Sequence, residues 1–486
     1  MFFVMCLMSN AMGQVGPGQP ATPGKTGTAP SAGTAAQTMS GQQSGPEQAG
    51  FPVLPGMPDL TGTGGPLSLP SGQRYEIKPY IFATEQYTSN VFLTNTNAKS
   101  DWITTIGPGI RMALNDPSFG ADITGNFGYN WYANQTKEDY WSVDGNLGLR
   151  YNPSPQLTFR VRDYIVRSAN TASSNFPVNG QPAQPGNITG LNQGTQPYLR
   201  NVVEPSVDWQ FSRQGSMGIL YRNSILINDD SNIYQNWMEN TVRPYASYWF
   251  DQRNNLALDY SFAAGTYSGG PGGFHSADYT TQTPHGRYTY RFDAQMSVFA
   301  DYTFVYQDND SPSISYSVNT PSLGIVYNFN PTLAATVQAG WFWMSPDSGV
   351  KAQDGLYSNV SLTQRDRQTT YTLAFNAGYN QDLNGSGSYG NLSFYKYYLG
   401  SVLVNHFLTQ RFSIGFIGTA QRTDYAFVDR NDWTYTADAT AGYQLLRWLT
   451  VGGRVGCLAN NSSNEVNSYD EWHVFLTLTA TFDNLL

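Results

Sequence analysis

The chain has few cysteines, few charged residues and no long apolar run, and each shortage excludes a class of protein. Cys6 and Cys457 are the only cysteines among the 486 residues, which are too few for a disulfide framework. Charged residues make up 13% of the chain and the net charge is −9, which gives no indication of nucleic-acid binding. No apolar stretch reaches the length of about 20 residues that a membrane helix requires, so a transmembrane helical protein is excluded.

Aromatic residues and glycine are abundant by contrast. The chain contains 33 Tyr, 26 Phe, 11 Trp and 48 Gly. This mixture favours β-strands and tight turns over helices, so we expect an all-β protein.

The N-terminal region differs in composition from the rest. Residues 1–13 form a short apolar run ending at the small residues Ala11 and Gly13, which is typical of a signal peptide and its cleavage site. The run lacks a basic start, so either the signal peptide is truncated at Met1 or the segment is not a signal. Residues 14–72 are mostly Gly, Pro, Ala, Ser, Thr and Gln and predict a disordered linker, whereas residues 73–486 read as one domain.

Within this domain, apolar and polar residues alternate along segments of about ten to fifteen residues. Between residues 333 and 343, apolar side chains from Leu333 to Trp343 alternate with Thr336, Gln338 and Gly340, as in a strand with one apolar face. Short connections, such as 115–118, alternate with long ones, such as 169–196. The pattern predicts an up-and-down antiparallel β-barrel of about 20 strands, within a range of about 18 to 22.

Aromatic residues stand near both ends of many predicted strands, around aliphatic or small residues. Trp433 and Tyr443 are ten steps apart around Ala439. At about 3.3 Å per step and a tilt of roughly 40°, ten steps rise about 25 Å, the height of the lipid-facing band of an outer-membrane barrel. We assign to the aromatic girdles Trp341, Trp343, Trp433, Tyr443, Trp472 and Phe482, and place Trp131, Tyr140, Trp141, Trp237 and Tyr306 at one end of their strands.

A large soluble β-protein is the competing interpretation. Two packed sheets would leave long edges to protect, and their inner faces should carry Leu, Ile and Val rather than aromatic ends around Ala and Gly. A propeller would show a fixed repeat length, which the sequence lacks. A transmembrane barrel in the outer membrane is therefore favoured.

Proline recurs in alternate predicted strands, about six to eight residues before a short turn. Because proline removes a ladder hydrogen bond, its presence inside strands is an objection to the assignment. We expect a repeated bulge or bend at these positions, with chance recurrence as the alternative. The prolines are Pro108, Pro205, Pro244, Pro284 and Pro321.

Charged residues fall on the polar face of the predicted strands, where lipid contact would be very costly. Such residues imply water inside the barrel, and about 20 strands enclose more space than side chains can fill. The connection 169–197 resembles in position the constriction loop of general porins. It either narrows the pore, with Arg150, Arg160, Arg162 and Arg167 nearby on the wall, or lies on the surface. The candidate pore-lining residues are Asp122, Asp144, Arg150, Arg160, Arg162, Asp208, Asp259, Asp301, Asp438 and Arg454.

The first predicted hairpin carries a recognisable set of short motifs. These are Asn90-Val91-Phe92, Ser100-Asp101, Ile103-Thr104-Thr105 and Pro108-Gly109, with Ser89 where an aspartate would be usual. In these residues the chain resembles the outer-membrane porins of the β-barrel porin 2 type; the other strands match only in pattern. The resemblance implies an outer-membrane β-barrel with a porin function, and some members of that group are associated with polysaccharide export.

The sequence therefore predicts a passive diffusion channel for small polar solutes in the outer membrane, with polysaccharide export or binding as the alternative. Four histidines occur, but none has the spacing of a catalytic nucleophile and its base, so we expect no enzyme activity. We expect no cofactor and no metal ion. The expected partners are outer-membrane lipid and lipopolysaccharide, the barrel-assembly machinery, and small polar solutes or saccharides; a homo-oligomer is compatible with the sequence, and no nucleic acid is expected.

Overall fold

The computed structural model describes residues 75–169, 197–231, 235–270, 277–310, 313–347, 351–381, 394–426 and 429–482. The signal peptide and the linker predicted over residues 1–72 lie outside this part of the chain. Most of the connection 169–197 lies outside it as well, so the prediction of a constriction loop there stays a prediction.

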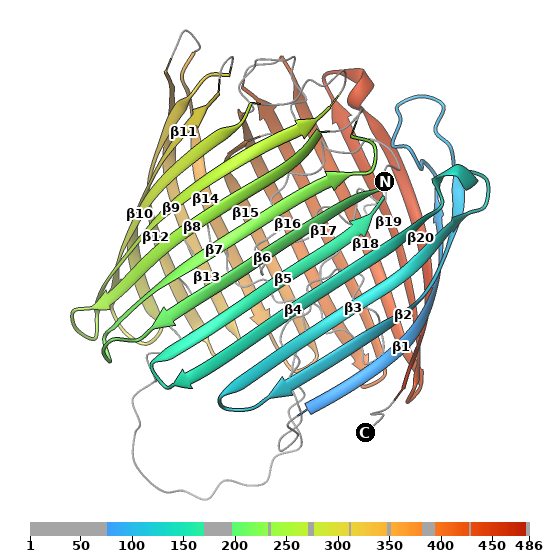
Figure 1. Ribbon diagram of the computed structural model, residues 1–486, viewed down its shortest axis with the longest axis horizontal. Coiled ribbons are helices and arrows are strands. Elements are labelled where there is room, and N and C mark those ends of the chain that lie inside the picture. The colour runs from blue at the N-terminus through green and yellow to red at the C-terminus, as the bar shows by residue number, and fades with distance from the viewer. Residues whose placement is uncertain are drawn as a thin grey trace, which may run out of the picture.

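Twenty antiparallel strands run up and down around one closed barrel, as predicted (Figure 1). The strands are β1 (Tyr75–Thr88), β2 (Asp101–Asn115), β3 (Phe119–Tyr132), β4 (Tyr140–Ser154), β5 (Leu157–Ser168), β6 (Tyr198–Trp209), β7 (Gly215–Asn228), β8 (Gln235–Trp249), β9 (Asn254–Gly269), β10 (Tyr279–Arg291), β11 (Met296–Asn309), β12 (Tyr316–Asn330), β13 (Leu333–Pro346), β14 (Gln353–Arg365), β15 (Thr369–Gln381), β16 (Phe394–Thr409), β17 (Phe412–Tyr425), β18 (Asn431–Leu446), β19 (Leu449–Ser462) and β20 (Tyr469–Thr481). Among the described residues, two short 3₁₀ helices, η3 (Thr136–Glu138) and η6 (Glu465–Asn467), lie in connections. In the described ranges, no helix is both long enough and apolar enough to span a membrane.

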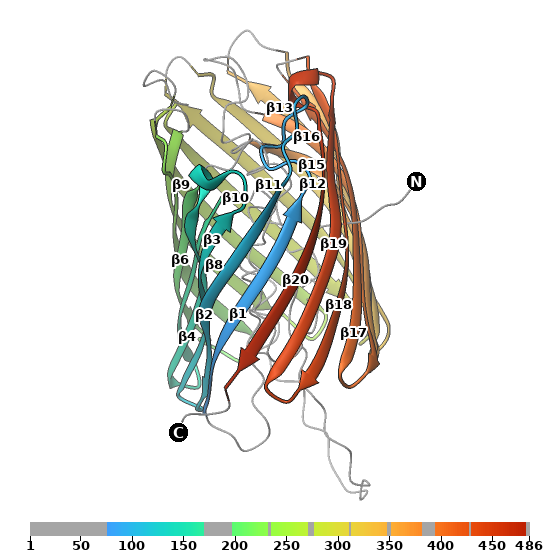
Figure 2. The ribbon, with the colours of Figure 1, turned by 90° about the vertical axis from the view of Figure 1, so that its right-hand side faces the viewer.

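The barrel closes where the first strand meets the last. In Figure 2 the blue β1 lies directly beside the dark red β20, and Tyr80–Thr88 pairs antiparallel with His473–Thr481. The hydroxyl groups of Thr84 and Thr477 lie 3.1 Å apart across this seam. Closure removes the exposed sheet edges that a flat sheet of this size would have to protect.

The tight turns at one rim are stabilised by the side chain that begins each turn. Asp251 Oδ1 accepts hydrogen bonds from the backbone N–H groups of Arg253 at 2.6 Å and Asn254 at 2.8 Å. Asp293 and Asn330 cap their turns in the same way. Asp and Asn favour turns for this reason, and the short connections in the sequence reflect this turn chemistry. We call this rim the short-turn rim and the opposite one the loop rim.

The recurring prolines do not form the bulges that the sequence suggested. At Pro321, pairing between β12 and β13 stops after Asn319↔Trp343 and resumes at Ser322↔Gly340 without a change of register. The same two-residue interruption with an unchanged register occurs at Pro108, Pro205, Pro244 and Pro284. Proline lacks an N–H group, so the ladder loses its bonds to the following strand, while pairing with the preceding strand continues.

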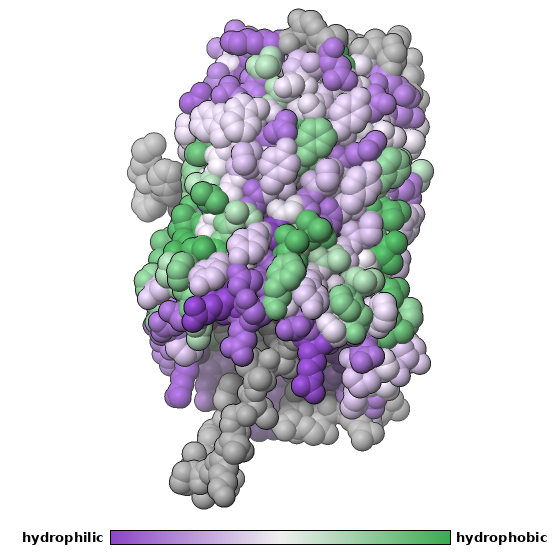
Figure 3. Space-filling view, turned by 90° about the vertical axis from the view of Figure 1, so that its left-hand side faces the viewer, coloured by the Kyte–Doolittle hydropathy of each residue, from purple (hydrophilic) through white to green (hydrophobic). Residues whose placement is uncertain are grey.

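The outer face carries the large apolar side chains. Figure 3 shows green apolar side chains across the lower middle of one side of the wall, with pale aromatic rings above them. The six residues assigned to the girdles lie near strand ends and are 39 to 52% exposed, as expected of side chains on an outer face: Trp341, Trp343, Trp433, Tyr443, Trp472 and Phe482. Their contact with lipid at the two interfaces stays a prediction.

Candidate functional site: the inner face of the barrel

The alternation of side chains along each strand places the ten candidate pore-lining residues on the inner face. On β3, for example, Phe127, Tyr129 and Trp131 are exposed outside, so Asp122 points the other way. Cross-strand partners share a face, which extends this assignment around the barrel. The inner-face residues are Asp122, Asp144, Arg150, Arg160, Arg162, Asp208, Asp259, Asp301, Asp438 and Arg454; their contact with a solute is not tested by this placement.

One network of charged side chains crosses four strands, from β8 to β11. Arg243 Nε donates to Asp259 Oδ1 at 3.0 Å, and Asp259 Oδ2 lies 2.7 Å from His285 Nδ1. His285 Nε2 lies 3.1 Å from Asp301 Oδ1, and Arg287 Nε donates to Asp301 Oδ2 at 2.6 Å. Each carboxylate therefore has two cationic or hydrogen-bonding partners, which offsets the cost of holding it against the wall.

A second network joins β18 and β19 to the seam. Arg454 Nη2 donates to Asp438 Oδ2 at 2.7 Å, and His473 Nε2 lies 2.9 Å from Asp438 Oδ1. The other ring nitrogen of His473 lies 2.8 Å from Glu471 Oε2, and Thr88 on β1 donates to Glu471 Oε1 at 2.7 Å. The side chain of Asp438 is fully buried, so this network fixes the relative positions of four strands around the closure of the barrel.

Ion pairs also line β5 to β8. Arg160 pairs with Asp208, which also accepts a hydrogen bond from the Tyr245 hydroxyl. Arg222 Nε donates to Glu204 Oε1 at 2.5 Å, and the side chain of this glutamate is only 4% exposed. On this part of the wall, acidic and basic side chains thus mostly neutralise each other in ion pairs.

Two other arginines of β5 differ from each other in orientation. Arg162 is exposed on the inner face and forms no ion pair with any described residue. Arg167 does not face the lumen, which corrects the prediction that placed it on the pore wall. Its guanidinium lies 4.1 Å from the ring of Trp141, an outward residue, and pairs with Asp229. A cation stacked on an aromatic ring near the loop rim suits the membrane interface.

Several residues of these networks were not singled out from the sequence: His285, His473, Arg243, Glu204 and Glu471. Each lies on the same strand face as a predicted inner residue or its cross-strand neighbour. Strand parity could therefore have placed them inside. Which of them touch each other depends on strand register, which parity does not supply.

The inner face from β12 to β16 contrasts with these charged networks. Its polar side chains are hydroxyls and amides, which lie among apolar ones such as Phe342 and Leu399. The only basic residues on these strands, apart from His406, are Arg365 and Lys396, one near each rim. Asp354 lies on the outer face, where its carboxylate accepts a hydrogen bond from Trp341 at 3.0 Å. The lumen thus has a charged wall and an uncharged wall, which we name the neutral wall.

At the loop rim, the ends of β15 and β16 separate from β14. β15 pairs with β14 only as far as Ala377, although its pairing with β16 continues to Gln381↔Phe394. The ring of Tyr379 lies 4.9 Å from that of Phe342 on β13, and the ring of Phe394 lies 5.8 Å from that of Tyr316 on β12. These contacts reach across β14, so the ends of β15 and β16 lean into the mouth of the barrel.

Two of the aromatic residues that the sequence places at strand ends, Trp237 and Tyr140, belong to the inner face. Trp237 packs against a buried cluster that includes Tyr198 and Leu226, and the ring of Tyr140 lies 6.5 Å from the inward ring of Tyr132. Aromatic residues at the loop rim therefore have two roles, outward at the interface and inward beneath the connections. Both kinds of aromatic residue lie at strand ends, so their position along the strand does not distinguish them.

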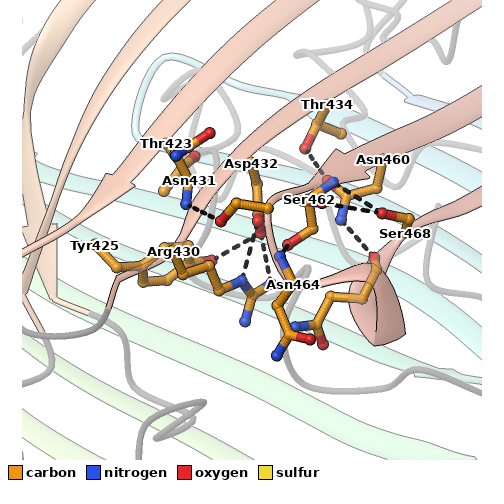
Figure 4. A network of polar contacts seen from close by, with 12 residues as sticks. Thr423, Tyr425, Arg430, Asn431, Asp432, Thr434, Asn460, Ser462, Asn464 and Ser468 are labelled. Carbon is orange, nitrogen blue, oxygen red and sulfur yellow. Dashed lines mark hydrogen bonds and ion pairs between the residues drawn. The ribbon is translucent and has the colours of Figure 1, made fainter.

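Polar contacts fix the connections of the last strands at the loop rim (Figure 4). Arg430 donates from Nε to Asp432 Oδ1 at 3.0 Å and from Nη2 to Asp432 Oδ2 at 2.5 Å. Its guanidinium lies 4.6 Å from the centre of the Tyr425 ring. Across the next connection, the backbone N–H of Ser462 donates to Ser468 Oγ at 3.0 Å. The bidentate geometry makes Arg430 a structural anchor rather than a free cation for solutes.

The closed barrel, its apolar outer face and its charged inner face define an integral β-barrel protein of the outer membrane. No protein-family model and no curated protein matches the chain, so the resemblance of the first hairpin to β-barrel porins stays a prediction.

Solved structures similar to this chain include outer-membrane receptors and transporters. A mutant of the ferric enterobactin receptor of Pseudomonas aeruginosa, in complex with enterobactin, has a TM-score of 0.47 at 9% identity, covering 84% of this chain and 81% of the receptor. The copper transporter OprC has a TM-score of 0.46 at 9% identity, with 86% and 84% covered. The siderophore receptor PirA of Acinetobacter baumannii has a TM-score of 0.47 at 9% identity, with 85% and 81% covered.

Proposed function

We propose that the protein is a passive diffusion pore for small polar solutes. The observation that carries the proposal is the inner face, which holds charged side chains on each strand from β3 to β11 and again from β18 to β20. Asp122 and Asp144 on this face are only partly buried, and they would be very costly to place against lipid, as would the ion-paired Asp259, Asp301 and Asp438. Exposed Arg162 adds a cation that is free to meet a passing solute.

The proposal assigns no reaction to the histidines. His285 and His473 each lie between two carboxylates, and His406 contacts the Thr369 hydroxyl at 2.8 Å on the outer face. A hydrolytic site would need a nucleophile, a base and an acid aligned at one rim. Lipid and lipopolysaccharide around the outer face, assembly by the barrel-assembly machinery and a possible homo-oligomer belong to the same proposal.

Reconstitution of the full chain in a planar lipid bilayer tests the pore. We expect steady, ohmic single-channel conductance from protein that shows the heat-modifiable mobility of a folded barrel. Removal of residues 170–196 should raise the conductance if that connection narrows the pore. A folded barrel with no conductance would contradict the proposal and would favour gated polysaccharide export instead.

A further inference from the structure

We infer that the neutral wall contains a binding site for uncharged, hydroxyl-rich solutes such as sugars, centred on an amide row of Gln338, Asn359 and Asn376. The inference rests on the proposed pore and names the class of solute that this pore favours. It follows from three features of β12 to β16, namely a shortage of charge, a continuous row of amides, and polar atoms that lack a protein partner.

The amide row crosses three neighbouring strands at one level. Gln338 on β13 is the register partner of Asn359 on β14, and Asn359 is in turn the partner of Asn376 on β15. All three lie on the inner face, because the exposed Val337 and Phe375 alternate with them. Cross-strand partners have Cβ atoms about 4.5–5.5 Å apart, so the three amides form one continuous polar surface.

Hydroxyl groups surround this row. Ser322 Oγ accepts a hydrogen bond from Gln338 Nε2 at 2.8 Å, and Ser361 follows Asn359 on the same face. Thr363 and Thr372 share a hydrogen bond of 3.3 Å one step closer to the short-turn rim. Each of these groups can both donate and accept, which is also true of every hydroxyl of a sugar.

Two buried amide atoms on this wall have no hydrogen-bond partner among the described residues. They are Asn359 Oδ1, in the amide row, and Asn405 Nδ2, on β16 closer to the short-turn rim. The two residues are 5% and 4% exposed, and an unpaired polar atom at such a site is costly. Both atoms are covered by neighbouring groups, so a solute reaches either of them only when its amide turns toward the lumen. One is an acceptor and the other a donor, so hydroxyl groups can then satisfy both, whereas a carboxylate or an ammonium ion could satisfy only one kind.

Charge selects the same class of solute. An ion moving along the neutral wall would give up hydration without meeting an opposite charge, because the basic groups Arg365 and Lys396 stand near the rims. On both sides of the neutral wall, the charged networks of β8 to β11 and of β18 to β20 hold their carboxylates and arginines in pairs. A neutral polyol therefore finds its best set of hydrogen-bonding partners on β12 to β16.

The test measures block of ionic current through the full-length protein in a planar bilayer. The probes are a neutral glucose oligomer and an acidic oligomer of galacturonate of the same length. We expect concentration-dependent block by the neutral oligomer at concentrations where the acidic oligomer has little effect. Equal block by both, or none by either, in a conducting channel would overturn the inference while leaving the pore intact; absence of conductance would overturn the pore itself.

Substitutions locate the site. Asn359→Leu should weaken block by the neutral oligomer about tenfold, because hydrogen bonds worth about 1–1.5 kcal/mol are removed. Asn359→Asp should keep the shape of the row but introduce charge, so it should shift the reversal potential towards cations. Thr124→Leu, on the inner face of β3 in the charged wall, is the matched polar-to-apolar control and should leave the block unchanged. Equal weakening in Asn359→Leu and Thr124→Leu would exclude a localised site.

Discussion

Replacement of Asp438 by asparagine should weaken the closure of the barrel severely. The side chain of Asp438 is 0% exposed. Its Oδ2 lies 2.7 Å from Arg454 Nη2 on β19, and its Oδ1 lies 2.9 Å from His473 Nε2 on β20. Asp438→Asn keeps the shape of the side chain but leaves the guanidinium of Arg454 without its counter-charge in a buried position. Removing one partner of a buried ion pair typically costs about 3–5 kcal/mol, and we expect the free energy of unfolding to fall by an amount in that range.

Urea unfolding in lipid vesicles, followed by tryptophan fluorescence, measures this loss, and heat-modifiable mobility on gels shows whether the barrel still closes. Arg422→Gln is the control, because Arg422 pairs with Asp424 on the outer face and its side chain is 45% exposed. An exposed pair is worth under about 1 kcal/mol, so the control should barely move the midpoint. Similar small losses in both variants would refute the view that the Asp438 network holds the last strands at the seam.

Three further outcomes follow from individual contacts. Gly340→Val should destabilise the barrel by about 1–3 kcal/mol in the same unfolding assay, because a Cβ there would lie 2.2 Å from the backbone oxygen of Pro321. Tyr379→Ala should raise single-channel conductance without changing ion preference, because it removes an uncharged ring from the inward-leaning end of β15; an unchanged conductance would place the narrowest point elsewhere. The N–H of Arg253 holds the pKa of Asp251 below its ordinary value, so the turn contributes stability above that ordinary value and loses it as pH falls through the lowered pKa; Asp251→Asn should remove this acid-side dependence, as measured by unfolding midpoints across pH.

The alternation of apolar and polar residues was enough to predict the architecture. A period of two assigns each strand residue to one face, and the contrast between outward Trp433 and inward Asp438 on β18 follows from that rule alone. Short connections rich in Asp and Asn located one rim, and the number of strands followed from the number of connections. These features are local, so a single sequence contains them.

Contacts between strands could not be read in the same way. His285 lies between Asp259 and Asp301 only because β9, β10 and β11 pair in one particular register, and a shift of two residues would keep every side chain on its face but separate the three. The predicted bulges at the prolines were wrong for a related reason. Pro321 interrupts hydrogen bonding to one neighbour while the register passes through unchanged, and the sequence does not distinguish that outcome from a bulge.

The net charge of −9 is a poor guide to what the pore prefers, because charge on the inner face is largely paired. Asp208, Asp259, Asp301 and Asp438 each form an ion pair with an arginine, so these four carboxylates present little free negative charge to a solute. Paired charges keep water in the barrel and hold the strands together, but they compete weakly for a passing ion. Discrimination then depends on groups whose hydrogen bonds are not already used. The amide row of the neutral wall offers such groups away from the paired charges, which is why a barrel lined by many charges is expected to favour solutes that carry none.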